Sequence, residues 1–526
     1  MSPFSRSYLT PVACGAALAI AFPTWHIFPL AWVALVPMLR NCMQLSRRAT
    51  AMQFYVAGFI FHLVLLQWLM TNIYWAGGWA WWGYVALSAI LALYWWFTGL
   101  FWSYARTNLK WLPPELSLPV LWIAMEYLQS FLFTGFGWSG LAYSQGSDLW
   151  LAQWAALGGA PIVSGIVLLI NVLIARAWSE PRGKIVRLLA AAIVLAGSHG
   201  IGAAMMEAPD YGKAPFKAAL LQADFPLEMK WDREYTVEMV RNASQKSRML
   251  VAQEPADLIV WPESLIMDDI ELPEILEEVS TLARDTGANL FAGAHRMNES
   301  QKSMNSAYLI DADGVVQEYY DKIHLAPFGE YVPLSTFLPF IKQVVPAIGN
   351  IEHGAIVKTF PVSGREIGPL ICFEVLFPEM AEALRRDGAD ILVVITNLGW
   401  FGASNAIGQE LEIARLRAIE TRLPLLHCAN TGITGVFDPW GRFTPVNTYF
   451  RDADEFFPVE LKSRYDMVTH RFGGVLPVAA PALRPWNAGP VVVPRVALVC
   501  AILLIMGSGA SRLFQRRATV DETPDD

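Results

Sequence analysis

Long apolar stretches follow one another along this chain, and they constrain its fold more than any other feature. The hydrocarbon core of a bilayer requires about 20 mostly apolar residues for each spanning helix. The composition agrees with a membrane protein, since 54% of the 526 residues are hydrophobic and only 16% are charged, outside the usual range for soluble domains. We predict eight spans, near residues 8–22, 25–40, 51–72, 82–106, 116–133, 155–177, 185–206 and 490–510. The first two are divided at Pro23 and could instead form one re-entrant unit.

The basic residues between these stretches indicate the topology, because Lys and Arg concentrate in cytoplasmic loops. The loops at residues 71–79 and 134–154 contain neither residue type, whereas the alternate loops contain several. The basic residues of the predicted cytoplasmic side are Arg6, Arg40, Arg47, Arg48, Arg106, Lys110, Arg176, Arg182, Lys184, Arg187, Arg512, Arg516 and Arg517. We therefore predict a membrane domain of seven spans at residues 1–209, a non-cytoplasmic domain at 210–485, and a closing span with a cytoplasmic tail at 486–526. The pattern thus predicts a multi-pass membrane protein.

Between residues 210 and 485, short β-like runs alternate with amphipathic helical stretches, which predicts helices packed on sheets in layers. The predicted strands are 216–222, 258–261, 289–295, 306–310, 315–319, 367–373, 391–396, 425–429 and 435–437. The predicted helices are 233–253, 272–286, 377–387 and 407–421. Asp313 and Gly314 form a hairpin-type turn signal between two of the strands.

Three local clusters in this domain contain residues suited to catalysis. Glu263 follows an apolar run that ends in Trp261 and Pro262, Lys322 lies in the run DKIHLAPFGEYVP, and Cys372 ends the run LIC. A cysteine where a strand turns into a helix is in a place that favours thiolate. Each cluster alone has a simpler interpretation: a cysteine ending an apolar strand is usually a buried small hydrophobe, and a disulfide from Cys372 to Cys428 is a further alternative.

Together, in the order Glu, Lys, Cys, the clusters resemble the carbon-nitrogen hydrolase, or nitrilase, superfamily, whose αββα sandwich carries a Glu-Lys-Cys triad. The whole chain is similar to one membrane branch, the apolipoprotein N-acyltransferase family, which has a polytopic N-terminal half, a non-cytoplasmic nitrilase-like domain and one closing helix. The motifs that carry the resemblance are WPES around Glu263, DKIHLAPFGEYVP around Lys322, ICFE around Cys372, Lys230-Trp231, and the run 412–420 that leads to 429–434. The chain departs from the family pattern at Leu398, where Asp is usual, at Glu410, where His is common, and at Phe373, where Tyr is common.

The resemblance implies an acyltransferase. Cys372 would hold the acyl chain as a thioester, Glu263 would act as general base and acid, and Lys322 would stabilise each oxyanion. The implied donor is a phospholipid, and the implied acceptors are diacylglyceryl-modified apolipoproteins. The resemblance also implies a bacterial inner membrane, with the catalytic domain at 210–485 on the periplasmic side. We expect no cofactor and no metal.

Five further residues are expected to support this site. Glu330 would hold Lys322 or touch the substrate, and Glu374 would play a similar part, although solvated loop carboxylates are nearly as plausible. Trp231, Phe373 and Trp400 would bind substrate or support the triad, although core packing would explain the two tryptophans almost as well.

The apolar segment 334–346 is expected to be a lid that dips into the outer leaflet, or else a segment packed on the rest of the protein. One alternative function keeps the triad in a membrane-anchored amidase. Another is a transporter, for which Glu126 and His62 are the ionisable candidates within spans. A formal net charge of −8 argues against nucleic-acid binding.

Overall fold

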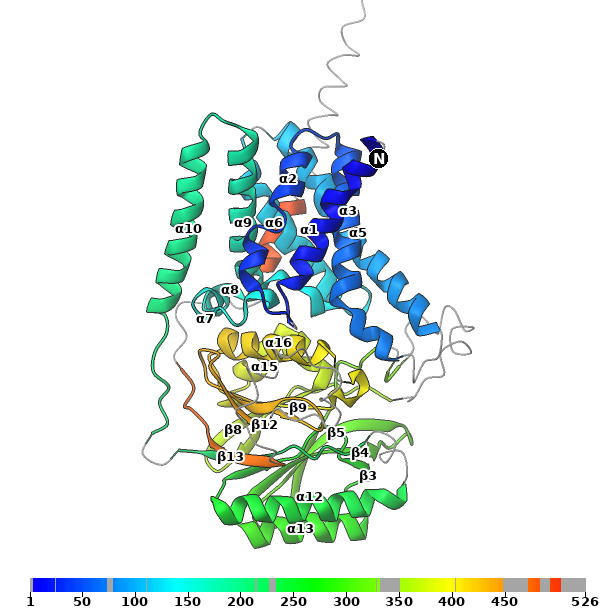
Figure 1. Cartoon of the computed structure of the whole chain (residues 1–526). Coiled ribbons are helices and arrows are strands. Elements are labelled where there is room, and N and C mark those ends of the chain that lie inside the picture. The colour runs from blue at the N-terminus through cyan, green and yellow to red at the C-terminus, as the bar shows by residue number, and fades with distance from the viewer. Residues whose placement is uncertain are drawn as a thin grey trace, which may run out of the picture. The chain divides into compact units, whose positions relative to one another are not determined.

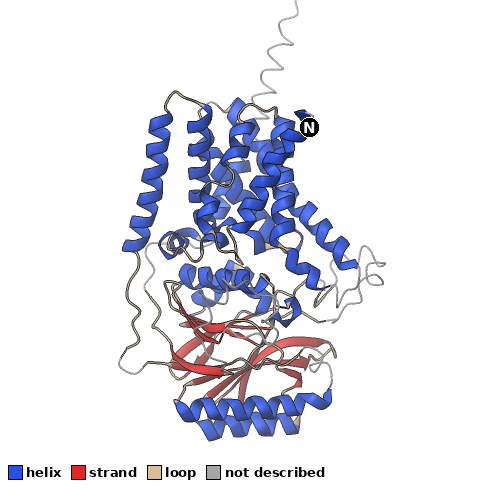
Figure 2. Cartoon of the chain, in the orientation of Figure 1, coloured by secondary structure: helices blue, strands red, loops and turns tan. Residues whose placement is uncertain are grey.

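The structure is a computed structural model that describes residues 3–23, 25–72, 79–109, 111–212, 215–226, 233–327, 329–331, 351–402, 404–447, 472–482 and 492–502. The chain divides into two compact units (Figure 1). The first comprises Met1–Gln67, Tyr84–Ala203 and Asn487–Asp526, and the second comprises Trp68–Gly83 and Ala204–Trp486. The first unit is helical in its described part, and the strands belong to the second (Figure 2).

Four helices of the described chain are long and apolar enough to cross a membrane: Arg47–Leu65, Trp81–Asn108, Ala160–Ser179 and Lys184–Ala204. They coincide with the third, fourth, sixth and seventh predicted spans, so the prediction of membrane helices is supported at these positions. The helical elements are α1 (Pro3–Ile20), η1 (Phe28–Trp32), α2 (Val36–Cys42), α3 (Arg47–Leu65), η2 (Gln67–Asn72), α5 (Trp79–Asn108), α6 (Pro114–Phe131), η3 (Leu132–Thr134), η4 (Gly137–Ser139), η5 (Leu141–Gln145), α7 (Leu149–Ala152), α8 (Ala155–Gly158), α9 (Ala160–Ser179) and α10 (Lys184–Ala204).

Three predicted spans differ from the observed helices, and the first of them, 25–40, is divided into η1 and α2. The stretch 51–72 ends as a helix at Leu65, and Trp68 belongs to the second unit, where its indole Nε1 donates to Gln409 (3.1 Å) and its ring meets Phe401 edge-on. The stretch 155–177 is interrupted at Gly159, whose φ of +86° suits glycine and separates α8 from α9. Trp68 and Gly159 are both compatible with an apolar stretch. Hydropathy alone therefore shows neither the helix end at Leu65 nor the break at Gly159.

The second unit contains two mixed β-sheets. One has the strand order β13-β1-β2-β4-β5-β6 with β3 paired to β4, and the other has the order β12-β11-β10-β9-β8-β7. Parallel pairing joins β1, β2 and β4 in the first sheet and β8, β9 and β10 in the second. The strands are β1 (Lys217–Leu221), β2 (Leu258–Val260), β3 (Ile266–Asp269), β4 (Asn289–Met297), β5 (Ser303–Ile310), β6 (Val316–Asp321), β7 (Phe360–Val362), β8 (Arg365–Ile371), β9 (Ile391–Thr396), β10 (Leu425–Ala429), β11 (Thr434–Phe437), β12 (Phe443–Asn447) and β13 (Gly473–Pro477).

Helices pack on both sheets, and the sheets contact each other. Helices α12 (Arg233–Gln253) and α13 (Pro273–Thr286) pack on the first sheet, while α15 (Pro378–Arg386) and α16 (Ala406–Thr421) pack on the second (Figure 1). Strand β1 contacts β10 and β11, and β5 contacts β8. The predicted layering of helices on sheets is therefore confirmed.

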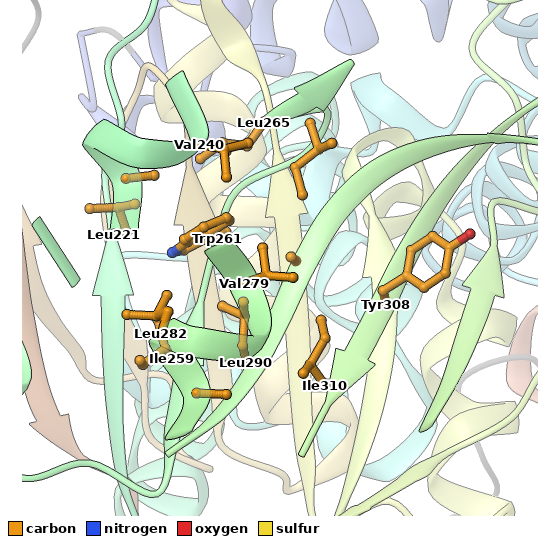
Figure 3. Packing of buried hydrophobic residues seen from close by; sticks show 14 of the residues in the cluster. Leu221, Val240, Ile259, Trp261, Leu265, Val279, Leu282, Leu290, Tyr308 and Ile310 are labelled. Atoms are coloured by element: carbon orange, nitrogen blue, oxygen red, sulfur yellow. The ribbon is translucent and has the colours of Figure 1, made fainter. Parts of the chain in front are cut away.

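Trp261 lies in the apolar core between the first sheet and its two helices (Figure 3). Its side chain is fully buried, and its indole Nε1 donates to the hydroxyl of Ser247 on α12 at 2.9 Å. A buried indole stabilises a core through its large apolar area while satisfying its one donor. The core thus fixes Trp261, which directly follows β2 and lies two residues before Glu263.

The predicted strands and helices of this unit are all present, but four further strands were missed. Strands β7, β12 and β13 each contain proline and lie at sheet edges, and β3 contains two aspartates and pairs only with β4 among the described strands. Proline and aspartate are depleted from strands and are tolerated mainly at edges. One predicted strand also ran too far: β8 ends at Ile371, and Cys372 begins the short helix η6 (Cys372–Leu376).

Gly293 in β4 allows the chain to approach the turn after β2. A Cβ at this position would lie 2.5 Å from the carbonyl oxygen of Pro262 and 2.8 Å from Cα of Glu263. We expect Gly293→Ala to cost about 1–3 kcal/mol through overpacking, and so to lower the Tm in detergent by several degrees. Gly200→Ala is the control, because it adds the same methyl group where nothing lies within 4 Å. Equal Tm values for the two variants would contradict this account.

Candidate active site

The three residues of the predicted triad lie just beyond the ends of three strands. Glu263 follows β2 by a short turn, Lys322 directly follows β6, and Cys372 directly follows β8. Glu263 and Lys322 therefore come from the first sheet and Cys372 from the second. Polar groups commonly meet at the ends of strands in α/β layers.

Lys322 is buried between two carboxylates. Its Nζ lies 3.0 Å from Oε1 of Glu263 and 3.0 Å from Oε2 of Glu330. Asn305 on β5 donates through Nδ2 to Oε1 of Glu263 and to Oε1 of Glu330, at 2.9 Å each. The backbone N–H of Ala326 donates to the other Glu330 oxygen at 2.7 Å. One ammonium and two carboxylates thus form a hydrogen-bonded cluster with one excess negative charge.

The charges in this cluster fix the protonation of its members. Burial alone would raise the pKa of Glu263, but the Lys322 ammonium and the Asn305 amide hold that pKa below its ordinary value. Burial would likewise lower the pKa of Lys322, yet the carboxylates of Glu263 and Glu330 raise it well above its ordinary value. Glu263 is therefore an ionised base at neutral pH, and Lys322 is a cation.

Cys372 is held in a left-handed backbone conformation, with φ of +51°. A non-glycine residue with this φ is uncommon, and such strain persists only where the surroundings impose it. The conformation begins η6 directly after β8, and the negative charge of Glu263 acts on the Cys372 thiol. The strand-to-helix turn thus brings the thiol to the carboxylate that could accept its proton.

The resting form of Cys372 differs from the expectation of a favoured thiolate. Burial and the negative charge of Glu263 raise the pKa of Cys372 well above its ordinary value, and Lys322 lowers it only in part. The protein therefore holds a neutral thiol close to an ionised carboxylate, rather than a free thiolate. The sequence pattern marked the turn but could not show a carboxylate directly beside the sulfur.

Glu374 joins the Cys372 turn to the segment that carries Lys322. Its Oε1 accepts from the Tyr320 hydroxyl (2.7 Å) and from the backbone N–H groups of Ile323 (2.7 Å) and His324 (3.2 Å). Its Oε2 accepts from the N–H of Ile371 at 2.7 Å. Burial raises the pKa of Glu374 to about 7, against the lowering effect of these donors. One buried carboxyl group therefore crosslinks the loops after β6 and β8.

The remaining expected residues have varied surroundings. Phe373 packs edge-on against Phe377, which in turn stacks on His324 at 4.0 Å between ring centroids. Trp400 lies partly buried in η7 (Leu398–Phe401). Trp231 and the segment 334–346 lie outside the described residues. Leu398, one of the departures from the family pattern, is buried in the core.

Two alternatives from the sequence can be compared with the structure. Cys372 and Cys428 are both free, so the predicted alternative of a disulfide between them is wrong. The thiol of Cys428 instead donates to the carbonyl oxygens of Leu221 and Val260, which fixes it between the sheets. In the described part of the chain, no group of three or more His, Cys, Asp or Glu side chains is placed to hold a metal ion.

Asn305 was not predicted from the sequence, although it holds both carboxylates that flank Lys322. A signal existed, since Asn305 is a buried polar residue in the middle of strand β5. A buried amide requires hydrogen-bond partners, so such a residue could have been flagged as part of a polar site. Nothing in the local sequence, however, indicates which partners it has.

Comparison with known proteins places this site in a family. Residues 217–452 match the family model for carbon-nitrogen hydrolases, and residues 14–173 match that for the apolipoprotein N-acyltransferase N-terminal domain. The fold and site thus define a carbon-nitrogen hydrolase domain joined to a membrane domain.

Two curated relatives carry the assignment further. The apolipoprotein N-acyltransferase of Geobacter metallireducens is 35% identical over 465 residues, covering 85% of this chain and 88% of that protein. The corresponding protein of Vibrio vulnificus is 30% identical over 455 residues, covering 84% and 88%. The chain belongs to the apolipoprotein N-acyltransferase family, and it is an acyltransferase of the carbon-nitrogen hydrolase superfamily. The solved structure of Nit3 from Saccharomyces cerevisiae, a member of the nitrilase superfamily, matches 50% of this chain and 99% of its own at 17% identity, with a TM-score of 0.37.

The Glu374 crosslink yields a prediction. In Glu374→Gln, either orientation of the amide turns its NH₂ toward a backbone N–H, that of Ile371 or those of Ile323 and His324. An unsatisfied buried donor costs about 1–3 kcal/mol, so we expect a lower Tm and a loss of acyl transfer of about tenfold or more.

The Tm difference between the wild-type protein and Glu374→Gln should depend on pH in a defined direction. The folded-state pKa of about 7 exceeds the ordinary value of 4.5, so the wild-type protein loses stability as pH rises through this window. Glu374→Gln cannot titrate, and the Tm difference between the two proteins should narrow from pH 5 to pH 8. A difference that widens over this range would refute the assignment of a raised pKa to Glu374.

Proposed function

We propose that this enzyme transfers an acyl chain from a phospholipid to the α-amino group of an N-terminal diacylglyceryl-cysteine in an apolipoprotein, through a thioester on Cys372. The observation that carries the proposal is the Cys372 thiol beside the ionised Glu263, with Lys322 fixed at 3.0 Å from that carboxylate. Membership of the acyltransferase family supplies the class of reaction. A thiol is suited to hold an acyl group because sulfur is strongly nucleophilic, and two easier steps replace one difficult step.

The first half-reaction forms the thioester. Glu263 accepts the thiol proton as the sulfur of Cys372 attacks the ester carbonyl carbon of the phospholipid, and the carbonyl oxygen becomes an oxyanion. Lys322 stabilises this oxyanion with its positive charge. The carbon–oxygen bond then breaks, and the proton on Glu263 passes to the departing alkoxide, which leaves as the hydroxyl of a lysophospholipid.

The second half-reaction regenerates the thiol. The α-amino group of the apolipoprotein attacks the thioester carbon, and Glu263 accepts a proton from the nitrogen. Lys322 again stabilises the oxyanion. The carbon–sulfur bond breaks to leave an amide, and the Cys372 sulfur recovers a proton from Glu263.

Neighbouring residues would support these steps. Glu330 and Asn305 would keep the Lys322 ammonium next to the Glu263 carboxylate. Glu374 would position the turn that carries Cys372. Trp231, Phe373 and Trp400 would bind the acyl chain or the acceptor. The apolar segment 334–346 would act as a lid that keeps water from the thioester until the amine arrives.

The proposed setting is a bacterial inner membrane. It includes eight spans, a membrane domain at residues 1–209, a periplasmic catalytic domain at 210–485 with the αββα sandwich of the superfamily, and a closing span with its tail at 486–526. Four described helices are long and apolar enough to cross a membrane, which supports the membrane location. Both substrates would be lipids or lipid-anchored, and confinement to one leaflet would raise their effective concentration.

A reconstituted transfer assay tests the proposal. In proteoliposomes that contain phospholipid with a labelled acyl chain, the wild-type enzyme should convert a diacylglyceryl-cysteine peptide into its N-acyl product and release lysophospholipid. Lys322→Met should reduce the rate by about 100-fold or more, because loss of one oxyanion donor costs about 3 kcal/mol.

Lys302→Met is the matched control for the same substitution, since Lys302 is half-exposed and pairs with Glu352 rather than with a triad residue. Equal activity of the two lysine variants would contradict the role of Lys322. Release of ammonia from soluble amides without lipid, with no N-acyl peptide formed, would favour the membrane-anchored amidase instead.

A further inference from the structure

The turn that carries Glu263 bulges out of the first sheet. Strands β2 and β3, on either side of this turn, both pair with β4, at Val260 with Phe291 and at Ile266 with Ala294. The chain from Val260 to Ile266 thus runs beside a shorter stretch of β4, and the residues between these two positions leave the ladder. Extra residues of this kind bend a strand and re-aim its side chains.

The backbone of the turn is strained at Ser264, the residue directly after Glu263. Its φ is +51°, in the left-handed region that residues other than glycine rarely adopt. Such a conformation persists only where the surroundings impose it. Close packing is one constraint, because a Cβ on Gly293 of β4 would lie 2.9 Å from the backbone nitrogen of Ser264. A glycine brings the turn close to β4 but offers no side chain to hold it.

A histidine on β4 supplies a second constraint. Nε2 of His295 lies 3.0 Å from the hydroxyl oxygen of Ser264, in a partly buried contact. A hydroxyl group both donates and accepts, so this hydrogen bond forms with either tautomer of the ring and with the imidazolium. On the other side of the ring, Nδ1 lies 3.5 Å from the hydroxyl oxygen of Ser303 on β5. The imidazole thus joins the turn to both β4 and β5.

His295 lies directly opposite Asn305 in the pairing of β4 with β5. Side chains of directly opposed residues lie on the same face of a sheet. Asn305 donates to the Glu263 carboxylate at 2.9 Å, and His295 contacts the hydroxyl of the next residue, Ser264. One cross-strand pair therefore holds two successive side chains of the turn. The Asn305 contact acts on the carboxylate itself, and the His295 contact acts on the backbone that carries it.

We propose that His295 is a positioning residue for Glu263: it holds the Ser264 hydroxyl and so keeps the turn in the left-handed conformation that presents the Glu263 carboxylate. The inference rests on the proposed role of Glu263 as general base. His295 takes no proton from either substrate in this account. It keeps the base where the reaction requires it, and a misplacement of about 1 Å can cost about 100-fold in rate.

Steady-state kinetics in proteoliposomes test the role of His295. In His295→Phe, which keeps a ring but removes both nitrogens, and in Ser264→Ala, we expect kcat for N-acyl transfer to fall by about tenfold or more. The KM for phospholipid should stay nearly unchanged, because neither residue contacts the lipid in the proposed reaction. His295→Gln should recover most of the rate, since its amide can reach the Ser264 hydroxyl. The double variant Ser264→Ala/His295→Phe should lose no more than the more affected single variant, because both changes remove the same contact.

Two substitutions elsewhere are matched controls. Ser363 has the same left-handed conformation, with φ of +47°, and its hydroxyl accepts from Asn289, but it lies in the turn between β7 and β8. The side chain of His353 is 66% exposed. Ser363→Ala and His353→Phe should therefore leave kcat unchanged. Variants of His295 and Ser264 with a lower Tm but the wild-type kcat would overturn the proposal, as would a double variant whose loss is the product of the two single losses.

Hydrogen exchange gives a second measurement that needs no lipid. In the purified enzyme in detergent, peptides that contain residues 261–265 should exchange their backbone hydrogens faster in His295→Phe and in Ser264→Ala than in the wild type. Peptides from α13 should exchange as in the wild type. Unchanged exchange in the turn would overturn the proposal.

The two measurements separate this proposal from the proposed function. A wild-type enzyme that forms no thioester with phospholipid, while the variants show faster exchange in the turn, would refute the proposed function and retain the role of His295 in fixing the turn. A wild-type enzyme that forms the thioester, with variants that match its kcat, would do the reverse.

Discussion

The position of Lys322 between two buried carboxylates is the interaction on which the rest of the site depends. Moving an ion from water into a protein interior costs several kcal/mol of solvation free energy, even after the protein relaxes. Attraction to a partner charge offsets this cost only in part. Here the cluster carries one excess negative charge, and the amide of Asn305 and the N–H of Ala326 donate further hydrogen bonds to its carboxylates. Such an arrangement is a poor way to stabilise a fold, but it is a good way to hold an ionised base against a thiol.

Burial, together with the same excess charge, explains why Cys372 rests as a thiol. Beside Glu263 the sulfur keeps its proton, and Lys322 compensates only in part. The proton can leave when the sulfur begins to bond to an acyl carbon, because the negative charge then moves to an oxyanion. In this account the lysine acts mainly on charge that develops during the reaction, and the resting site is protected from adventitious oxidation or alkylation, since thiolate is the reactive form.

Much of the fold and of the site could be predicted from the sequence, wherever a short run of neighbouring residues was enough to indicate the structure. Periodic patterns identified the central strands and helices of the second unit, and the runs around Glu263, Lys322 and Cys372 identified three residues that the fold brings together. Edge strands β7, β12 and β13 were not predicted because each contains proline. Proline in a short run of sequence argues against a strand. Asn305 was missed for another reason: its partners, Glu263 and Glu330, lie in the turns after other strands, and no spacing along the chain encodes such contacts. In the membrane unit, hydropathy found the long helices but not the break at Gly159, which depends on one backbone conformation.

The central claim is that Cys372 carries the acyl chain, and mass spectrometry of the intact enzyme tests it most directly. After incubation with phospholipid of a single acyl composition and no acceptor, a peptide that contains Cys372 should gain the mass of one acyl group. Hydroxylamine should remove this mass, because it cleaves thioesters, and addition of a diacylglyceryl-cysteine peptide should transfer it to the peptide amine. A stable acyl group on another residue, or full transfer activity in Cys372→Ala, would contradict the account.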